Sequence, residues 1–174
     1  MSETIAKPKM HTFHTSLKTG QAGELLWSSL IKEFYPEYKL DHNDGRKHDF
    51  TLRSPFGPFT LELKTDSYDM TKTQNVFMEK YSNWDKKSPG GPWQSQSKNI
   101  DLYCYWHPTN RIMLTYNVNL LVSRLEELNI KDSKLIPIMN RGFITKGAKV
   151  PREALHDICT RIYLGPESDD SGLC

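Results

Sequence analysis

Two alternating stretches joined by turn residues constrain the fold of this chain more than any other feature. Residues 48–53 (HDFTLR) and 59–64 (FTLELK) alternate apolar and polar side chains, and the segment SPFGP lies between them. A period of two places successive side chains on opposite faces of a strand, while Pro and Gly favour a turn. The pattern therefore predicts a β-hairpin with one apolar face and one polar face.

The polar face of this hairpin gathers charged side chains. Asp49 lies on it in the first strand, and Glu62 and Lys64 lie on it in the second. A loop over residues 54–57 sets Asp49 opposite Glu62, whereas a longer loop sets Asp49 opposite Lys64 with Glu62 diagonal. Both registers keep the two carboxylates within about 5–8 Å of each other. A divalent cation between them would remove their repulsion, and Lys64 would orient an attacking water and offset charge on a phosphate.

The alternative is that Glu62 and Lys64 belong to a solvated strand face, since an acid two places before a lysine also occurs at 37–39, 85–87 and 132–134. The matched Asp49 and a preceding helix that carries Glu24 favour a site. Glu24 shares a partly apolar helical arc with Trp27, where a carboxylate needs a partner. For Glu24 the alternative is a surface position near the positive helix end.

The rest of the chain alternates helical and extended patterns, which predicts a mixed α/β domain. We expect a flexible arm over residues 1–16, a single domain over 17–165 and a disordered acidic tail over 166–174. The expected elements are a helix from Thr19 to Phe34, strands at 75–81, 101–106 and 111–116, a loop at 82–96, a helix from Asn117 or Asn119 to Leu128, a buried strand at 135–139, a short helix opened by Pro151, and a strand or helix end at 158–164.

Composition excludes several classes of protein. A length of 174 residues fits one domain, and there is no apolar run long enough for a membrane helix and no secretory signal pattern. Three cysteines without a CxxC pair argue against a disulfide framework or a zinc site, and no Gly-rich phosphate loop indicates an NTPase. We therefore expect a soluble, cytoplasmic protein.

The charge is unevenly distributed along the chain. Of 23 basic and 21 acidic side chains, residues 153–174 hold one and five, so the first 152 residues carry an excess of six positive charges. In the 82–96 loop, Trp84 and Trp93 lie near Lys86 and Lys87, a pattern that can stack bases and follow phosphates. Packing of the loop by the two tryptophans is the alternative. Lys98 is a further candidate for a phosphate contact, with an exposed helix lysine as its alternative.

A helix glutamate, a strand aspartate and then Glu-x-Lys on the next strand resemble the PD-(D/E)xK nuclease superfamily. The resemblance covers about Thr19 to Glu79 by motif, and extends to Trp106 by strand order. It implies a restriction-endonuclease-like core, a mixed central β-sheet flanked by helices. It also implies catalytic and metal-binding roles for Glu24, Asp49 and Glu62, a catalytic role for Lys64, a metal-ligating carbonyl at Leu63, and a secondary role for Glu79. No Pro precedes Asp49, unlike the pattern in the superfamily's name.

The function implied by this resemblance is metal-dependent endonucleolytic cleavage of DNA phosphodiester bonds, with Mg²⁺ as cofactor and Mn²⁺ able to replace it. The single domain favours structure-guided or dimer-assisted cutting, and a phage or other mobile element is the expected source. Two alternatives remain open: a non-catalytic nucleic-acid-binding module that keeps the fold, and a structural or interaction protein. The sequence distinguishes neither the DNA structure cleaved nor endonuclease from exonuclease action.

Overall fold

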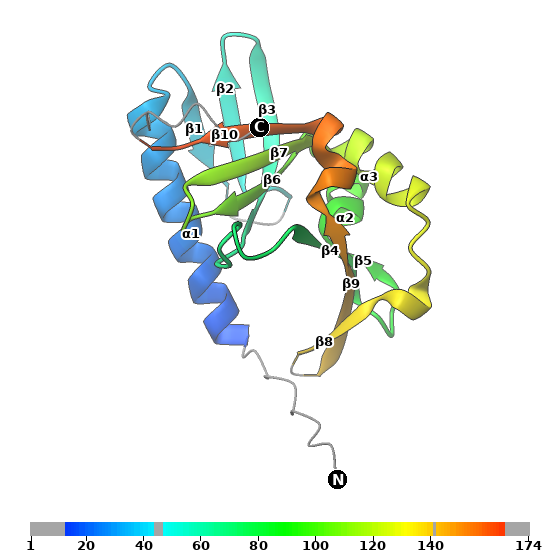
Figure 1. The fold of residues 1–174 in the computed structure, drawn as a ribbon. Helices are drawn as coiled ribbons and strands as arrows, with labels where there is room; N and C mark the ends of the chain where they lie inside the picture. Colours follow the sequence, from blue (N-terminus) through cyan, green and yellow to red (C-terminus); the bar gives the residue numbers. More distant parts are fainter. Residues whose placement is uncertain (1–12, 44–46, 141, 166–174) are drawn as a thin grey trace.

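A computed structural model describes residues 13–43, 47–140 and 142–165 of the chain. A six-stranded mixed sheet forms its centre (Figure 1). Its only parallel neighbours among the described strands are the third and fourth. In spatial order the strands are β1 (Lys39–His42), β2 (Phe50–Ser54), β3 (Gly57–Thr65), β6 (Leu102–His107), β7 (Ile112–Asn117) and β10 (Cys159–Tyr163).

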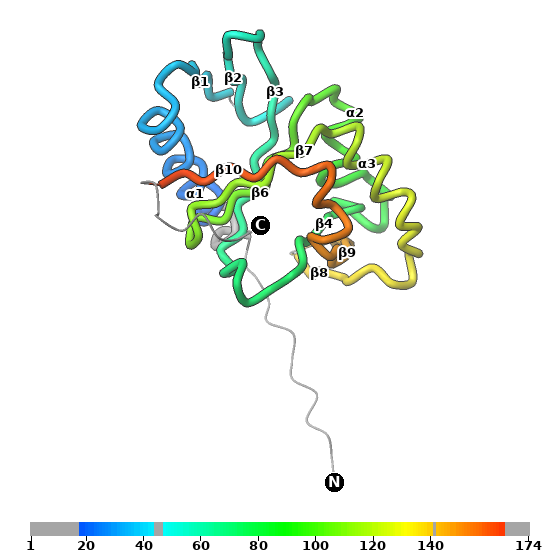
Figure 2. The backbone as a smooth tube through the Cα atoms, turned by 45° about the horizontal axis from the view of Figure 1, so that its top comes forward, coloured from blue at the N-terminus to red at the C-terminus, as the bar shows by residue number. Residues whose placement is uncertain are grey.

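A second, four-stranded antiparallel sheet lies beside the first. Figure 2 follows the chain from β3 out to β4 of this sheet, and then back through α2 into β6. Its spatial order is β5 (Ser88–Pro89), β4 (Asn75–Asn83), β9 (Phe143–Pro151) and β8 (Ile136–Asn140). The helices are α1 (Phe13–Phe34), α2 (Gly91–Ser97) and α3 (Val118–Glu127), with 3₁₀ turns at Asp132–Lys134 and Arg152–Ile158.

Helix α1 packs on the apolar face of the hairpin, as the phase of the sequence requires. Trp27 of α1 is fully buried, its ring centroid lies 4.9 Å from that of Phe50, and its indole N–H donates to Met113 Sδ at 2.9 Å. Leu61 and Leu63 of β3 belong to the same buried cluster. The large indole buried here stabilises the helix against the sheet.

The polar face of the hairpin turns toward a second core. Glu62 pairs with Tyr103 and Lys64 with Tyr105 across the parallel β3–β6 ladder. Both tyrosines are buried in a cluster that includes Met78 of the second sheet and residues of α3. Glu62 and Lys64 therefore lie on the side of the central sheet that faces α2 and the second sheet rather than α1.

Most predicted elements are confirmed. The structure has a mixed α/β fold with a central sheet flanked by helices, the hairpin, the strand at 75–81, and the strands on either side of the 107–110 turn. The side-chain oxygen of Asn117 accepts from the N–H of Leu120, so Asn117 rather than Asn119 caps α3. The segment at 158–164 is a strand, and a 3₁₀ turn follows Pro151.

Several predictions were wrong. The first helix begins at Phe13 instead of Thr19, so residues 13–16 of the expected arm are helical. The 82–96 segment holds β5 and most of α2 rather than a plain loop. The strand at 136–140 is mostly exposed, because it lies at the edge of the second sheet. Strands β1 and β9 were not anticipated. Residues 1–12 and the acidic tail lie outside the described residues.

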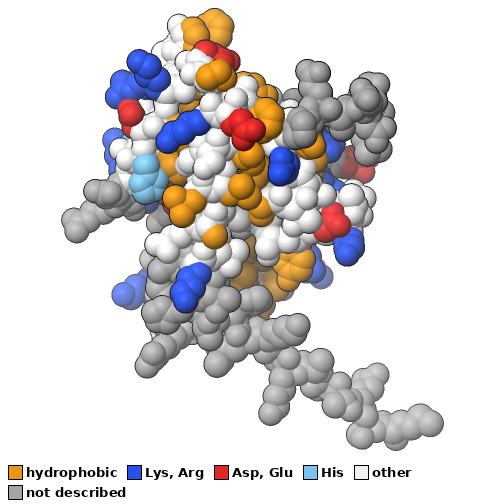
Figure 3. Space-filling model, turned by 90° about the vertical axis from the view of Figure 1, so that its left-hand side faces the viewer, with side chains coloured by type: hydrophobic (Ala, Val, Ile, Leu, Met, Phe, Trp, Pro, Cys, Tyr) orange, Lys and Arg blue, Asp and Glu red, His pale blue; other side chains and the backbone are white. Residues whose placement is uncertain are grey.

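The outer side of α1 carries apolar residues as well as charges. Leu25 and Leu26 are 72% and 42% exposed. On the side of the molecule that α1 occupies, hydrophobic side chains lie between Lys and Arg side chains (Figure 3). Within the described residues, no helix is both long and apolar enough to cross a membrane.

Candidate active site

The hairpin register brings Asp49 and Glu62 together. Phe50 pairs with Leu61 and Ser54 with Gly57, which is the register of the shorter loop. Asp49 lies one residue before β2 and continues this ladder, since its backbone N–H donates to the carbonyl of Leu61 at 3.1 Å. Its carboxylate Oδ2 accepts from the N–H of Leu63 at 2.8 Å. Backbone hydrogen bonds thus fix the aspartate at the position facing Glu62.

The pKa of Glu62 reflects its burial and the negative charges close to it. Burial and the neighbouring charge of Asp49 raise the pKa of Glu62 to about 7, and Glu24 adds to that effect. Lys98 and Lys64 act in the opposite direction on the same pKa. A carboxylate with a pKa near neutrality lacks enough positive charge around it, and a cation would supply that charge.

Glu24 completes a cluster of three acids on three elements, which we call the carboxylate cluster (Glu24, Asp49 and Glu62). Burial and Asp49 raise the pKa of Glu24, although His42 opposes them. Burial also raises the pKa of Asp49, while the hydrogen bond from Leu63, His42 and Lys98 lower it. The helix that packs on one face of the sheet therefore still brings its glutamate into the field of the hairpin aspartate.

His42 is a member of the site that the sequence analysis missed. Its Nε2 lies 3.6 Å from Glu24 Oε2, and its ring packs against Phe50 at 5.0 Å between centroids. It stands on β1, a four-residue edge strand whose residues follow Pro36 closely. The strand is too short and too polar to give an alternating signal, so the sequence offered no means of placing this histidine.

The lysine and the secondary glutamate also meet at the site. Burial raises the pKa of Glu79, and the charge of Lys64 offsets this increase only in part. Glu79 stands on β4, and its carboxylate packs so closely on Gly90 that a Cβ there would lie 2.5 Å from Oε1. The phenol of Tyr103 has a pKa raised by burial and also by the charges of Glu79, Glu62 and Asp49. Glu79 therefore shares one electrostatic environment with the carboxylate cluster.

Lys98 stands closer to the carboxylates than its sequence position suggested. It is the C-cap of α2, and its charge lowers the pKa of both Asp49 and Glu62. Its backbone N–H donates to the carbonyl of Gln94, so the last turn of α2 holds its position. A lysine beside two acids can contact a phosphate oxygen that approaches them.

The two tryptophans of the 82–96 segment differ in their surroundings. The ammonium groups of Lys87 and Lys146 lie 2.7 and 3.5 Å from the centroid of the Trp84 ring. Lys80 pairs with Asp132 at 3.0 Å. We call Lys80, Lys87 and Lys146 the lysine cluster. Trp93, in contrast, is a residue of α2, and Lys86 is exposed beside this cluster.

Whether the site fits a divalent cation can be judged from its donors. Among the described residues, no group of three or more His, Cys, Asp or Glu side chains is arranged to hold a metal ion. Mg²⁺, however, is typically bound by one or two carboxylates and keeps several waters. Asp49 and Glu62 are such a pair, and the charge of Asp49 contributes to the raised pKa of Glu62. The donors present fit a water-rich magnesium site and do not form a closed cage.

The fold of this chain is similar to that of a known protein. No family model matches the chain, and no curated protein matches its sequence. The solved structure titled as that of a bacterial homing endonuclease, I-Ssp6803I, matches with a TM-score of 0.42 and 14% identity. The match covers 63% of this chain and 72% of that chain. With so few identical residues, the similarity concerns the fold alone.

Proposed function

We propose that this protein is a metal-dependent DNA endonuclease of the PD-(D/E)xK type, whose reaction takes place at Asp49, Glu62 and Lys64. The observation that carries the proposal is the hairpin register, which opposes two partly buried carboxylates. Among the described residues, the charges of Lys98 and Lys64 offset the raised pKa of Glu62 only in part. Such an arrangement opposes folding unless it serves a ligand. A divalent cation is the ligand that carboxylate oxygens prefer.

The donor set assigns the residues that would hold the ion. Asp49 and Glu62 supply carboxylate oxygens, Glu24 assists from α1, and the Leu63 carbonyl is a further ligand by the superfamily resemblance. A bound Mg²⁺ supplies Lewis-acid activation and charge neutralisation in phosphodiester hydrolysis. Mn²⁺ would take the same oxygen ligands.

The side chains of this chain perform the remaining tasks. The charge of Lys64 lowers the pKa of both Glu62 and Glu79, which supports a role in which its ammonium would donate to a nucleophilic water and a phosphate oxygen. Lys98 approaches the same acids from α2 and can offset phosphate charge. The basic body of the chain, together with the lysine cluster, would attract the DNA backbone. Substrate is thereby drawn toward an acidic centre that would otherwise repel it.

A plasmid-nicking assay tests the proposal. The full chain is incubated with supercoiled plasmid in Mg²⁺, in Mn²⁺ and in EDTA, next to Glu62→Gln and Lys64→Ala. We expect nicking with either ion, none in EDTA, and none by the two variants. A matched control is Asp41→Asn, because Asp41 is a β-strand acid that pairs only with exposed Arg53 among the described residues. DNA binding without nicking under every condition would instead support the non-catalytic binding module.

A further inference from the structure

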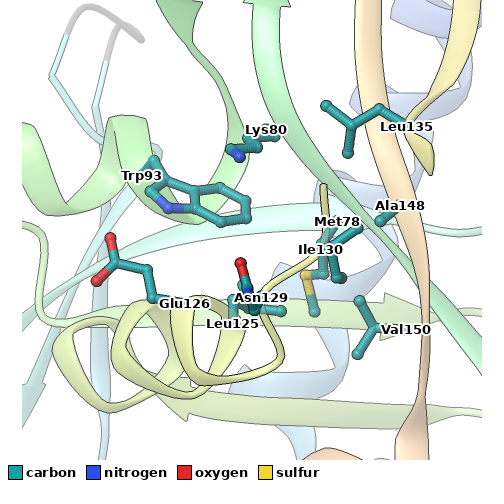
Figure 4. Close-up of a pocket in the computed structure, with 10 residues that line it drawn as sticks. All are labelled: Met78, Lys80, Trp93, Leu125, Glu126, Asn129, Ile130, Leu135, Ala148 and Val150. Carbon is teal, nitrogen blue, oxygen red and sulfur yellow. The ribbon is translucent and has the colours of Figure 1, made fainter. Parts of the chain in front are cut away.

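A cavity of about 220 Å³ lies between α2, the C-terminal end of α3 and the second sheet (Figure 4). Its floor is apolar, with Met78 of β4 and Ala148 and Val150 of β9 all buried. The indole of Trp93 forms a wall. None of the three residues of the carboxylate cluster lines this cavity.

The rim of the cavity is polar, in contrast to its floor. Asn129, Glu126 and Lys80 line it, and in Figure 4 Lys80 lies above the Trp93 ring and Asn129 below it. Asn129 has a positive φ of 47°, a conformation that places its amide just past the end of α3. An apolar cavity of about 150 Å³ accepts benzene. The larger volume here, with an aromatic wall and hydrogen-bonding groups at the rim, suits a planar heteroaromatic ring.

The floor of the cavity continues into the lysine cluster. Met78 pairs directly with Ala148, and Lys80 and Lys146 follow two residues along the same two strands. The ammonium of Lys146 is held over the Trp84 ring, opposite no carboxylate among the described ion pairs. Positive charge thus lies beside the opening, where the phosphates on either side of an inserted base would pass.

The cavity also stands close to the proposed reaction centre. Trp93 and Lys98 are five residues apart on α2 and its cap, which corresponds to a rise of about 7.5 Å. β4 carries Met78 and Lys80 in the cavity and Glu79 in the environment of the carboxylate cluster. A DNA strand covers about 3.4 Å per nucleotide along a duplex. A base in the cavity is then within a few nucleotides of the reacting phosphate.

From these four observations we propose that the cavity receives one unstacked nucleobase, so that the protein selects DNA with an unpaired base near the cleaved bond. The proposal rests on the proposed function for the identity of its substrate, DNA. Trp93 would stack on the base, Asn129 and Glu126 would face its edge, and Lys80 and Lys146 would hold the neighbouring phosphates.

The test compares two duplexes that differ by one unpaired 2-aminopurine, in Ca²⁺, with the affinity and the probe fluorescence as readouts. The full chain is compared with Trp93→Leu, with Ala148→Met, which fills the cavity and leaves the indole in place, and with Asn129→Gly, which keeps the backbone conformation. Leu120→Ala is the matched control, since Leu120 is an exposed residue of α3 that does not line the cavity. Melting curves verify that each variant is folded.

We expect the wild type and Leu120→Ala to bind the bulged duplex about tenfold or more tightly than the paired one. Trp93→Leu and Ala148→Met should lose that preference, and Asn129→Gly, which removes the amide from the rim, should reduce it. Equal affinity of the wild type for both duplexes would overturn the proposal, as would a preference that Ala148→Met retains. The binding test in Ca²⁺ is independent of the plasmid-nicking assay in Mg²⁺ or Mn²⁺. A binding preference in a protein that nicks no plasmid would refute the nuclease and keep the cavity, whereas plasmid nicking without a binding preference would do the reverse.

Discussion

The carboxylate cluster and the lysine cluster differ in how the charges of their members are stabilised. Glu24, Asp49 and Glu62 stand together partly buried, and each has a pKa raised by burial. The lysines of the second sheet lie at the surface of aromatic rings, or beside Asp132. Acids that raise one another's pKa reduce stability at neutral pH, whereas cations over aromatic faces are mildly stabilised.

This difference indicates where a ligand contributes most. A cation entering between Asp49 and Glu62 relieves a repulsion built into the fold, so its binding should stabilise the whole domain. An anion that meets the lysine cluster replaces contacts that are already favourable, so it should bind weakly and stabilise the domain little.

The largest effect should come from neutralising the carboxylates. Glu62→Gln or Asp49→Asn should reduce the cleavage rate about a thousandfold or more, because each removes a charge that would hold the metal, a contribution of several kcal/mol. Plasmid nicking under single-turnover conditions measures the loss. Asp41→Asn, an acid on the neighbouring edge strand, serves as the control. Activity within tenfold of the wild type in both site variants would remove the basis of the contrast.

The second-largest effect should be the change of the free energy of unfolding with pH. The folded-state pKa of Glu62 is raised from 4.5 to about 7, so the folded protein binds more protons than the unfolded chain between these values. Stability without metal should therefore fall by about 3 kcal/mol as the pH rises from 4.5 to 7. Urea unfolding in EDTA at several pH values measures the fall. Glu62→Gln should flatten it, and a slope equal to that of the wild type would contradict the burial and repulsion described here.

Lys98→Ala removes a cation that stabilises the charged forms of Asp49 and Glu62, so it should have the third-largest effect. Since Lys98 lowers the pKa of Asp49 and Glu62, its loss should shift the acidic limb of the cleavage pH profile upward and reduce the rate at neutral pH about tenfold. Lys39→Ala, which removes an exposed lysine of β1, is the control. If the pH profile of cleavage does not shift in Lys98→Ala, then Lys98 does not tune the acids and can only contact DNA.

The smallest effect should come from the second sheet. Lys80 and Asp132 are 30% and 43% exposed, and pairs of this kind contribute about 0.2–1 kcal/mol. Asp132→Asn should therefore change the free energy of unfolding by less than 1 kcal/mol, and this small change should vanish in high salt. A loss comparable to the effects at Glu62 would mean that the two regions do not differ in the way described.

The sequence predicted the carboxylate region better than the lysine region, for a physical reason. The hairpin is local: its alternation and turn residues set the phase, and phase alone fixes which faces Asp49 and Glu62 share. Lys146 reaches Trp84 only through the pairing of β9 with β4, across more than sixty residues of sequence. Such non-local contacts leave no periodic signal. The position of His42 was hidden for another reason, since its edge strand has only four, mostly polar residues.

The sequence predicted α2 less well than the hairpin but better than the lysine cluster. The sequence predicts a loop at Gly90-Gly91-Pro92, whereas the structure has the start of a helix there, where Pro is favourable. Gly91 adopts a positive φ of 44°, with Glu79 and Tyr103 close by. The glycines admit the helix against β4, and this close approach is what brings Trp93 to the cavity and Lys98 to the acids. The sequence identifies Gly90 and Gly91 as turn residues, but only the tertiary structure shows that they allow α2 to pack closely against Glu79 of β4.

Direct titration of Mn²⁺ into the protein tests the central claim, that Asp49 and Glu62 form one cation site. Isothermal calorimetry at pH 7.5 should show binding by the wild type and by Asp41→Asn, and its loss in both Asp49→Asn and Glu62→Gln. The variants should unfold at a temperature equal to or above that of the metal-free wild type, because the repulsion is gone. Mn²⁺ binding of equal affinity in the wild type and both site variants would contradict the account.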